Sequence, residues 1–373
     1  MIPRILQDSL TSKLNQGKAI ILLGPRQVGK TTLLHSLFGN HKNVLWLNGD
    51  EIDVRNLFLN ISAARLKTYI GNNKIVIIDE AQRIQDIGLK LKLITDQINE
   101  VQLIATGSSS FELSNKLNEP LTGRKWEFKM YPISFKEMVD ANGLLNEKRL
   151  LPHRLVFGYY PDVINNPGNE IAIIKQLADS YLYKDILTID QIKKPEALQK
   201  LLQGLALQIG SQVSYSELAQ FCGLDAKTIE KYIKVLEDAF VIFRVTSFSR
   251  NLRTELKKSR KIYFYDNGIR NAIISNFNQI ENRTDIGALW ENFLMSERKK
   301  YLSYTNSYAN SWFWRTIEQK EIDLIEEKDG HINAFEFKWN KNEKAKIPKS
   351  FTTHYPEAVI KIIHSDNFEE FLL

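Results

Sequence analysis

The stretch that decides the fold is residues 19–32, which read AIILLGPRQVGKTT. Its first five residues are apolar and lead directly into Gly24, and an amphipathic segment follows Thr31 as far as Leu37. Residues 24–31 fit the pattern G-x-x-x-x-G-K-[ST] between a predicted strand and a predicted helix, which is the context that a phosphate-binding loop requires. The sequence therefore predicts an ATP site at this loop.

Each residue type in the loop has a chemical role. Glycines let backbone N–H groups approach the β-phosphate, and the N-terminus of the next helix adds partial positive charge. Lys30 is expected to reach the β- and γ-phosphates, and the Thr31 hydroxyl is expected to hold Mg²⁺. The predicted nucleotide-binding residues are Gly24, Pro25, Arg26, Gln27, Val28, Gly29, Lys30, Thr31 and Thr32.

A second predicted strand ends in two adjacent carboxylates. Residues 74–82 read KIVIIDEAQ, and four consecutive β-branched residues are typical of a buried central strand. Open α/β sheets bind ligands at the carboxyl ends of their strands, and two adjacent buried acids need a cation. Asp79 is therefore the predicted Mg²⁺ ligand, and Glu80 is the predicted base that orients or deprotonates the attacking water. A structural ion pair is the alternative.

Two further segments are candidates for contacts with the nucleotide. Residues 106–110, TGSSS, follow a predicted strand, and a polar side chain there either senses the γ-phosphate or belongs to an ordinary turn. Arg124 is a candidate arginine finger that acts in its own subunit or on a neighbouring one. A lone arginine is otherwise a surface residue. Strands at residues 19–23, 44–47, 75–78 and 102–106, alternating with helices, predict a parallel sheet covered on both faces.

Residues 215–238 have the pattern of a helix–turn–helix. Gly223 interrupts two helical segments, and Asp225 is the expected cap of the second helix. The expected apolar seam consists of Leu218, Ala219, Ile229, Ile233 and Leu236, and the outward residues include Lys227, Lys231 and Lys234. Predicted strands at 241–246 and 261–265 flank a basic stretch, which makes it a candidate wing. Duplex DNA and a protein are the two alternative partners of such a module.

Residues 321–338 are expected to form a hairpin. Two segments alternate at period two around Asp329-Gly330, and a turn centred there pairs residues whose numbers sum to 659. Asp323 is then expected opposite Glu336, and Glu321 opposite Lys338, on one polar face, with the other face apolar. Like charges directly opposite each other destabilise a hairpin.

A bound divalent metal ion would offset the repulsion between the negative charges of these acids. An Asp on one strand and Glu-x-Lys on the next is the metal site of PD-(D/E)XK nucleases, in which the lysine positions water. Asp323 and Glu336 are therefore candidate ligands, Lys338 is the candidate catalytic lysine, and Glu291 matches a further acid of such sites. The alternative is a solvated polar face with a weak surface pair between Glu321 and Lys338.

The composition sets outer limits. The chain of 373 residues has a net charge of +6 and a single cysteine, so no intrachain disulfide forms. Neither an apolar run of membrane-spanning length nor a signal-peptide pattern is present, which predicts a cytoplasmic protein without a membrane partner. Two basic runs in the C-terminal half suggest a polyanion as partner. Their basic residues are Arg250, Arg253, Lys257, Lys258, Arg260 and Lys261 in the first, and Lys338, Lys341, Lys344, Lys346 and Lys349 in the second.

The motifs together resemble a large prokaryotic family of AAA-type P-loop ATPases that carry a C-terminal domain of unknown function. The segments that carry this resemblance are GPRQVGKTT, IIDEAQ, ATGSS, LTGR and YPISFKE, followed by KIYFYD, GALWENF, EID and EFK. The resemblance covers nearly the whole chain and includes the Gly-Arg step at Arg124. It implies an ATPase, followed by a winged helix and a restriction-endonuclease-like fold.

The predicted architecture is therefore α/β: a P-loop core at 1–133, a helical lid at 134–200, a winged helix at 201–268 and a nuclease-like domain at 269–373. Two hypotheses stay open at this point. In one, ATP hydrolysis is coupled to metal-dependent DNA cleavage. In the other, a non-cutting regulatory ATPase grips DNA or a protein, and a homo-oligomer is an option in both.

Overall fold

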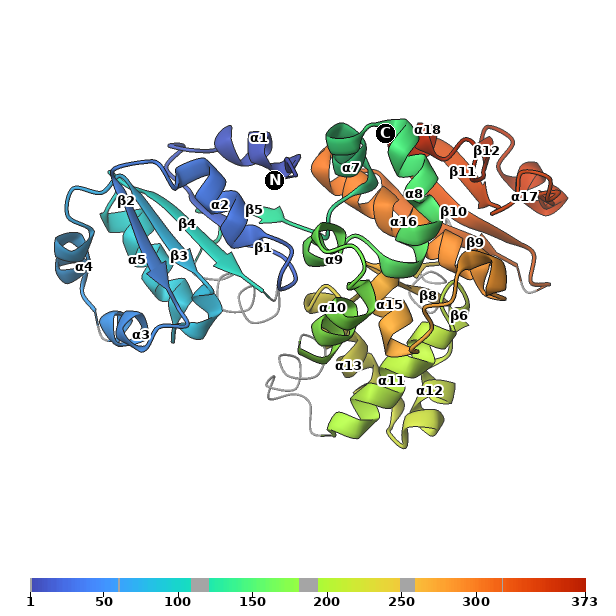
Figure 1. The fold of residues 1–373 in the computed structure, drawn as a ribbon, viewed down its shortest axis with the longest axis horizontal. Coiled ribbons are helices and arrows are strands. Elements are labelled where there is room, and N and C mark those ends of the chain that lie inside the picture. The colour runs from blue at the N-terminus through green and yellow to red at the C-terminus, as the bar shows by residue number, and fades with distance from the viewer. Residues whose placement is uncertain (1, 60, 109–120, 181–193, 249–258, 317) are drawn as a thin grey trace. The chain divides into compact units, whose positions relative to one another are not determined.

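The computed structural model describes residues 2–59, 61–108, 121–180, 194–248, 259–316 and 318–373. The chain forms two compact units (Figure 1). Unit 1 comprises Met1–Ile133 and Asp238–Phe240, and unit 2 comprises Ser134–Glu237 and Val241–Leu373. Within the described residues, unit 1 contains a five-stranded sheet, and unit 2 contains a four-stranded and a three-stranded sheet.

The sheet of unit 1 is parallel throughout, in the order β2-β3-β4-β1-β5. Every residue of β1 and β4 is buried, and because neighbouring residues of a strand face opposite sides, the sheet is covered on both faces. The strands are β1 (Ala19–Leu23), β2 (Val44–Asn48), β3 (Ile75–Asp79), β4 (Gln102–Gly107) and β5 (Lys125–Lys129). The helical segments are α1 (Leu6–Thr11), α2 (Lys30–Phe38), α3 (Ile52–Phe58), α4 (Ala63–Ile70), η1 (Ala81–Arg83) and α5 (Ile87–Gln97).

The four strands expected from the apolar runs are confirmed as β1 to β4. The prediction did not include β5, which pairs with β1 alone and forms an edge of the sheet. Its sequence, KWEFK, alternates charged and aromatic residues, and these side chains stay partly exposed. An edge strand of this kind lacks the continuous apolar run by which the central strands are found.

The first part of unit 2 is helical. Its helices are α7 (Phe135–Asn142), α8 (Leu144–Phe157), α9 (Pro161–Asn165), α10 (Glu170–Leu177) and α11 (Pro195–Leu207). A capping box begins α7, because Ser134 and Glu137 each accept a hydrogen bond from the other's backbone N–H. Across the described parts of the chain, no helix combines the length and the apolar character needed to cross a membrane.

The predicted helix–turn–helix is present as α12 (Tyr215–Cys222) and α13 (Ala226–Asp238). Gly223 has φ +65° between them, and Asp225 accepts a hydrogen bond of 3.0 Å from the N–H of Thr228, which confirms the cap. All five seam residues are buried. A small antiparallel sheet, β6-β8-β7, follows, with β6 (Gln212–Val213), β7 (Ile242–Thr246) and β8 (Arg260–Phe264). Arg250, Arg253, Lys257 and Lys258 lie outside the described residues.

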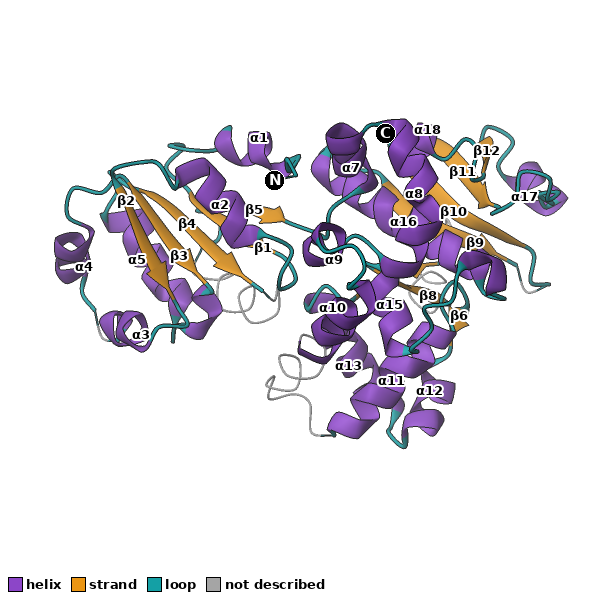
Figure 2. Cartoon of the chain, viewed as in Figure 1, coloured by secondary structure: helices purple, strands orange, loops and turns teal. Residues whose placement is uncertain are grey.

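The last part of unit 2 is a four-stranded sheet in the order β12-β11-β10-β9, which lies as one layer in Figure 2. It is antiparallel except for the parallel pair β11 and β12. The strands are β9 (Asn310–Arg315), β10 (Glu321–Lys328), β11 (His331–Phe337) and β12 (Val359–Ile363). The helical segments are α15 (Asn267–Ile273), η3 (Ile280–Asn282), α16 (Ile286–Tyr304), α17 (Lys349–His354) and α18 (Glu369–Leu372).

The predicted hairpin register is confirmed from Leu324, which pairs with Phe335, to the turn at Asp329-Gly330. Nearer the start of β10 the prediction is wrong. A register shift against β9 between Ile322 and Ile325 adds one residue to β10, which is a β-bulge. Ile322 and Ile325 therefore pack into the same apolar cluster, and strict alternation fails where Asp323 lies.

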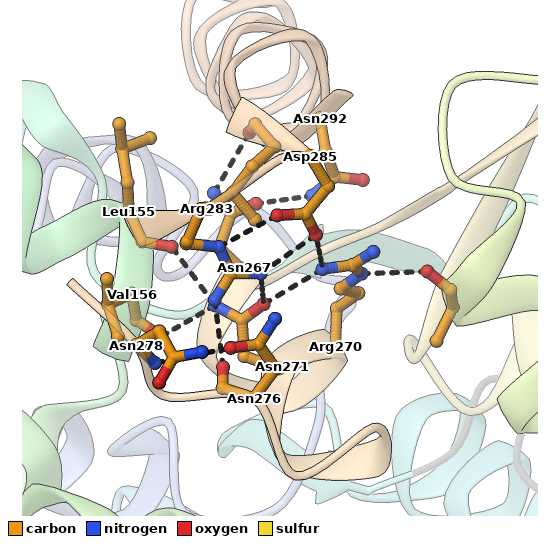
Figure 3. A network of polar contacts seen from close by, with 12 residues as sticks. Leu155, Val156, Asn267, Arg270, Asn271, Asn276, Asn278, Arg283, Asp285 and Asn292 are labelled. Carbon is orange, nitrogen blue, oxygen red and sulfur yellow. Dashed lines mark hydrogen bonds and ion pairs between the residues drawn. The ribbon is translucent and has the colours of Figure 1, made fainter. Parts of the chain in front are cut away.

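A buried polar network joins several helices of unit 2 (Figure 3). Asp285 accepts hydrogen bonds from Arg270 at 2.6 Å and from Arg283 at 2.8 Å. Arg270 also donates to the carbonyl oxygen of Ala206 on α11, and Asn271 donates to the carbonyl oxygen of Val156 on α8. Because Asp285 accepts from both arginines and the other groups are hydrogen-bonded to backbone carbonyl oxygens, this network ties α8, α11 and α15 to the segment that precedes α16.

Candidate functional site

The phosphate loop lies between β1 and α2, and the helix begins at Lys30. The Lys30 side chain is 5% exposed, and its Nζ donates hydrogen bonds of 2.8 Å to the carbonyl oxygens of Gly24 and Pro25. Burial lowers the pKa of Lys30 to about 8, against the opposing charges of Glu80 and Asp79. A desolvated ammonium group of this kind gains from an anionic ligand.

Two glycines shape the loop. A Cβ atom at Gly24 would lie 2.1 Å from the carbonyl oxygen of Met130, so any other residue would displace the chain just after β5. Gly29 has φ +94°, which residues with a side chain rarely adopt. The loop therefore leads into the N-terminus of α2, where the first backbone N–H groups of a helix have no partner within the helix. Of the other predicted loop residues, Pro25 and Val28 are buried, Arg26 is half-buried, and Gln27, Thr31 and Thr32 are exposed.

The predicted Mg²⁺ ligands lie together. Asp79 ends β3, and its Oδ2 accepts a hydrogen bond of 2.7 Å from Thr31 Oγ1 at the start of α2. Its Oδ1 accepts a second hydrogen bond from Thr106 Oγ1 at the end of β4. Mg²⁺ in nucleotide sites takes one or two protein oxygens and fills its remaining positions with waters and phosphates. The hydroxyl and the carboxylate present here fit that requirement.

Glu80 follows Asp79 in a strained backbone conformation with φ +47°. Its N–H donates to Thr106 Oγ1 at 3.1 Å, and its Oε2 accepts a hydrogen bond of 2.5 Å from Gln82 Nε2. Gln82 Nε2 also donates to Ser108 Oγ at 2.9 Å. Within the predicted sensor segment, Thr106 therefore contacts the Asp79 carboxylate and the backbone of Glu80, and Ser108 reaches Glu80 only through Gln82. Ser109 and Ser110 lie outside the described residues.

Arg4 is a loop contact that the sequence analysis missed. Its Nη1 donates to the carbonyl oxygen of Val28, and its Nη2 donates to that of Tyr131, both at 2.7 Å. The guanidinium group thus braces the phosphate loop against the segment that follows β5. Twenty-four residues separate Arg4 from Val28, and no local pattern in the sequence signals such a contact.

Arg124 lies at the opposite end of the sheet from the phosphate loop. Its carbonyl oxygen accepts a hydrogen bond from the N–H of Ala19, the first residue of β1, whereas the loop follows Leu23. The length of β1, roughly 16 Å, separates the two ends and exceeds the reach of an arginine side chain. The guanidinium group is paired with Asp96 of α5, with Nε 2.6 Å from Oδ1. The prediction of a finger acting in its own subunit is therefore wrong, and action on a neighbouring subunit stays a prediction.

The acids of the C-terminal sheet surround a lysine. Lys261 of β8 is 1% exposed, and its Nζ donates a hydrogen bond of 2.9 Å to Glu291 Oε1 and forms an ion pair with Glu321. Tyr263 donates a hydrogen bond of 2.7 Å to the same oxygen of Glu291. Burial alone would lower the pKa of Lys261, but the charges of Glu291, Asp323 and Glu321 raise it. The ammonium group is therefore firmly charged inside this cluster.

Asp323 and Glu336 are held separately. Asp323 Oδ2 accepts a hydrogen bond of 2.7 Å from the N–H of Phe337, and Glu336 Oε1 accepts one of 2.8 Å from Lys338. Burial, and then the charges of Glu291 and Glu336, raise the pKa of Asp323 well above its usual range. Burial also raises the pKa of Glu336, whose Oε2 is buried without a hydrogen-bond partner.

These contacts bear on three predictions. Among the described residues, no group of three or more Asp, Glu, His or Cys side chains is arranged to hold a metal ion, and the metal site of Glu291, Asp323 and Glu336 stays a prediction. The predicted pair of Glu321 with Lys338 is replaced by pairs of Glu321 with Lys261 and Arg315. The solvated polar face is wrong as well, because Glu336 is 8% exposed. Glu321 has a different partner from the predicted one because β8 brings the ammonium group of Lys261 next to it.

The predicted nucleic-acid surface keeps some of its expected basic residues and loses others. Lys227, Lys231 and Lys234 are exposed on α13 as expected. Lys261, in contrast, belongs to the buried cluster and not to a basic wing. Arg260, the other described basic residue of that stretch, stacks on the ring of Tyr215 with its guanidinium carbon 4.6 Å from the ring centroid.

Comparisons with known proteins agree with the architecture of unit 1. Residues 16–139 match a family described as an AAA domain. Two families described as domains of unknown function match residues 148–280 and 286–369. The chain thus carries an AAA-type P-loop domain followed by two domains whose families have no assigned function, and the AAA match implies nucleotide binding.

The relatives are prokaryotic. An uncharacterized protein of Mycobacterium tuberculosis is 26% identical over 337 residues, which cover 88% of this chain and 72% of that protein. An uncharacterized protein of Haemophilus influenzae is 25% identical over 386 residues, which cover 95% and 88% of the two chains. Among solved structures, a Walker-type ATPase of Pyrococcus abyssi superposes with a TM-score of 0.49 at 16% identity, covering 73% of this chain and 94% of that one.

Proposed function

We propose that this chain binds ATP with Mg²⁺ and hydrolyses it between the phosphate loop and the end of β3. The observation that carries the proposal is the 2.7 Å hydrogen bond between Thr31 Oγ1 and Asp79 Oδ2, next to the buried Lys30. Forty-eight residues separate Thr31 from Asp79, yet the fold brings together the groups that phosphoryl transfer needs. The match to the AAA domain supports the nucleotide-binding part of this proposal.

Each side chain has a separate role in this proposal. Loop N–H groups and Lys30 bind the phosphates, while Thr31 and Asp79 hold Mg²⁺ through a hydroxyl and a carboxylate oxygen. The metal, when bound, neutralises charge on the phosphate oxygens. Glu80 orients a water whose oxygen forms the new bond to the γ-phosphorus, and its carboxylate receives that water's proton as ADP leaves.

Substitution of Lys30 by alanine tests the binding step. The Lys30→Ala protein is expected to bind a fluorescent ATP analogue about ten- to a hundred-fold more weakly, because a hydrogen bond to a charged group contributes roughly 1.5–3 kcal/mol. The Lys42→Ala protein, which loses an exposed lysine of the same unit, is the matched control. Equal affinity of the Lys30→Ala and wild-type proteins for the analogue would contradict the nucleotide site.

We also propose that Arg124 acts on the nucleotide of a neighbouring subunit. Its placement at the far end of β1 supports this, since a residue there is available to a second copy of the chain. The ATPase rate per subunit is then expected to rise with protein concentration, and Arg124→Ala is expected to flatten that rise. The Asp96→Ala protein, which loses the ion-pair partner but keeps the arginine, is the control. A rate that does not depend on protein concentration would refute the proposal.

For the C-terminal sheet we favour a non-cutting, regulatory role over metal-dependent cleavage. The supporting observation is Lys261, whose ammonium group already binds Glu291, one of the three predicted metal ligands, and pairs with the neighbouring Glu321. Addition of a divalent cation next to it would bring like charges together in a buried space. The sheet retains the shape expected of a nuclease-like domain in this proposal, but its carboxylates stabilise the fold.

A melting experiment tests this role. In an Asp79→Asn background without nucleotide, Mn²⁺ is expected to leave the melting temperature unchanged, whether position 336 is Glu or Gln. A ligand that binds only the folded state would raise it by an amount set by RT ln(1 + [L]/Kd). A plasmid-nicking assay in Mg²⁺ and Mn²⁺ is expected to show no cleavage. A Mn²⁺-dependent increase that Glu336→Gln removes would restore the metal site.

We further propose that residues 201–268 form a winged helix that contacts duplex DNA. The order of α11, β6, α12, α13, β7 and β8 supports this, and so do the exposed lysines of α13. Phosphate contacts of this kind lose affinity as salt increases. A duplex-binding titration at two salt concentrations distinguishes this partner from a protein, because a protein partner predicts no duplex binding at either concentration.

A further inference from the structure

Gln82 is buried beside the predicted base, although the proposed mechanism assigns it no role. Its side chain lies in η1, two residues after Glu80, and is 5% exposed. Its Nε2 donates to Glu80 Oε2 at 2.5 Å and to Ser108 Oγ at 2.9 Å. One amide group thus connects the end of β3 with the end of β4.

The orientation of this amide follows from chemistry. An ionised carboxylate only accepts hydrogen bonds, so the NH₂ side of the amide must face Glu80. Both N–H groups are then used, one by Glu80 and one by Ser108. The other side of the amide, Oε1, is buried without a hydrogen-bond partner.

An unpartnered buried acceptor is unfavourable and needs an explanation. Glu80 adds a second unfavourable feature, because its φ of +47° is rare for a residue with a side chain. The unpartnered oxygen of Gln82 and the positive φ of Glu80 both accompany one arrangement, in which the Glu80 carboxylate is held in a single orientation beside Asp79. Strain concentrated in this way is typical of functional sites.

We propose that Gln82 is the positioning residue of the hydrolytic site, which holds the Glu80 carboxylate toward the attacking water and ties it to Ser108 at the end of β4. The inference rests on the proposed function, in which Glu80 orients that water. Gln82 itself touches neither the nucleotide nor the water. Its substitution therefore affects the rate of turnover and leaves the affinity for ATP unchanged.

The test compares the Gln82→Met protein with wild type. Methionine has a similar volume but no amide, so kcat is expected to fall about ten- to a hundred-fold, the equivalent of one hydrogen bond to a charged group. The dissociation constant of a fluorescent ATP analogue is expected to stay within about twofold of wild type, because the phosphate contacts are unchanged. The Ser108→Ala protein, which keeps Gln82, is expected to show a smaller fall in kcat.

Gln102 provides a matched control. It is also 5% exposed and lies on β4, but at the opposite end of the sheet, where its amide donates to the carbonyl oxygens of Lys18 and Leu103. The Gln102→Met protein is expected to melt at a lower temperature with unchanged kcat. A general effect of removing a buried amide would instead lower kcat in both proteins and overturn the inference.

A double-mutant cycle separates positioning from a structural role. If Gln82 acts through Glu80, adding Gln82→Met to Glu80→Gln is expected to produce no further fall in kcat. Additive effects, or a Gln82→Met protein with wild-type kcat while Glu80→Gln is slow, would overturn the inference and leave the proposed function intact. A Glu80→Gln protein with wild-type kcat would overturn both.

Discussion

Replacement of Glu80 by glutamine is expected to lower the rate of ATP hydrolysis by about 10²–10⁴-fold, the range that general acid–base groups contribute. The amide retains the shape of the side chain but accepts no proton from the attacking water. The contacts of Lys30, Thr31 and Asp79 are unchanged, so the affinity for ATP is expected to stay within about twofold of wild type. Steady-state phosphate release and titration with an ATP analogue measure the two quantities.

An exposed glutamate of the same unit is the control for this substitution. Glu51 precedes α3 without a side-chain capping bond, so Glu51→Gln is expected to hydrolyse ATP at the wild-type rate. Two results would contradict the assignment of the base. One is an unchanged rate in the Glu80→Gln protein, and the other is an equal loss in both variants.

Replacement of Lys261 by methionine is expected to lower the free energy of unfolding by about 3–5 kcal/mol, the cost of removing one partner of a buried ion pair. The loss arises because Glu291 and Glu321 lose the ammonium group that they share, while the nearby Asp323 loses its favourable charge. Denaturant titration of the full chain, with the fluorescence of tryptophans such as Trp314 as the signal, measures the change.

The dependence of this loss on pH has a definite sign. The pKa of Asp323 is raised by burial and neighbouring acids, so the folded state binds a proton here at a pH where the unfolded chain does not. Acidification from neutral pH therefore stabilises the folded state at this cluster, and it does so more strongly when Lys261 is absent. The difference in the free energy of unfolding between wild type and Lys261→Met is therefore expected to be smaller at pH 5 than at pH 7.

A second substitution serves as the control for Lys261→Met. Glu291 is the acid to which both Lys261 and Tyr263 donate. Adding Glu291→Gln to Lys261→Met removes one of the uncompensated charges and is expected to recover part of the lost stability. A Lys261→Met protein as stable as wild type would contradict the compensation described for this cluster.

The predictions that succeeded depend on neighbours in the sequence. β1 to β4 were found from continuous apolar runs, and the hairpin turn was found from Asp329-Gly330, both of which have positive φ in the structure. The cap at Asp225 involves a residue three positions away. In each case the energetic preference lies within a few residues, so the pattern alone identifies the element.

The predictions that failed depend on partners far away in the chain. The alternation of polar and apolar residues predicted that Asp323 faces Glu336. In the structure, a bulge of β10 relative to β9 interrupts this alternation near Asp323, and no feature within the hairpin signals the bulge. Action of Arg124 on its own nucleotide stayed an option because β5 was missed, although β5 fixes this residue at the far end of β1. Gln82 and Arg4 were missed for the same reason, since their partners Ser108 and Val28 lie in other elements.

What the sequence by itself determined is the phosphate loop and the acids that face it, because a glycine with positive φ and an acid that ends a buried strand are local requirements. What only the tertiary structure decided is the character of the second acidic cluster. Three acids in a hairpin and a helix are equally compatible with a metal and with an ammonium group. Which cation compensates the acids depends on the element that packs against them. Here that element is β8, which places Lys261 in contact with Glu291, 30 residues away in the sequence.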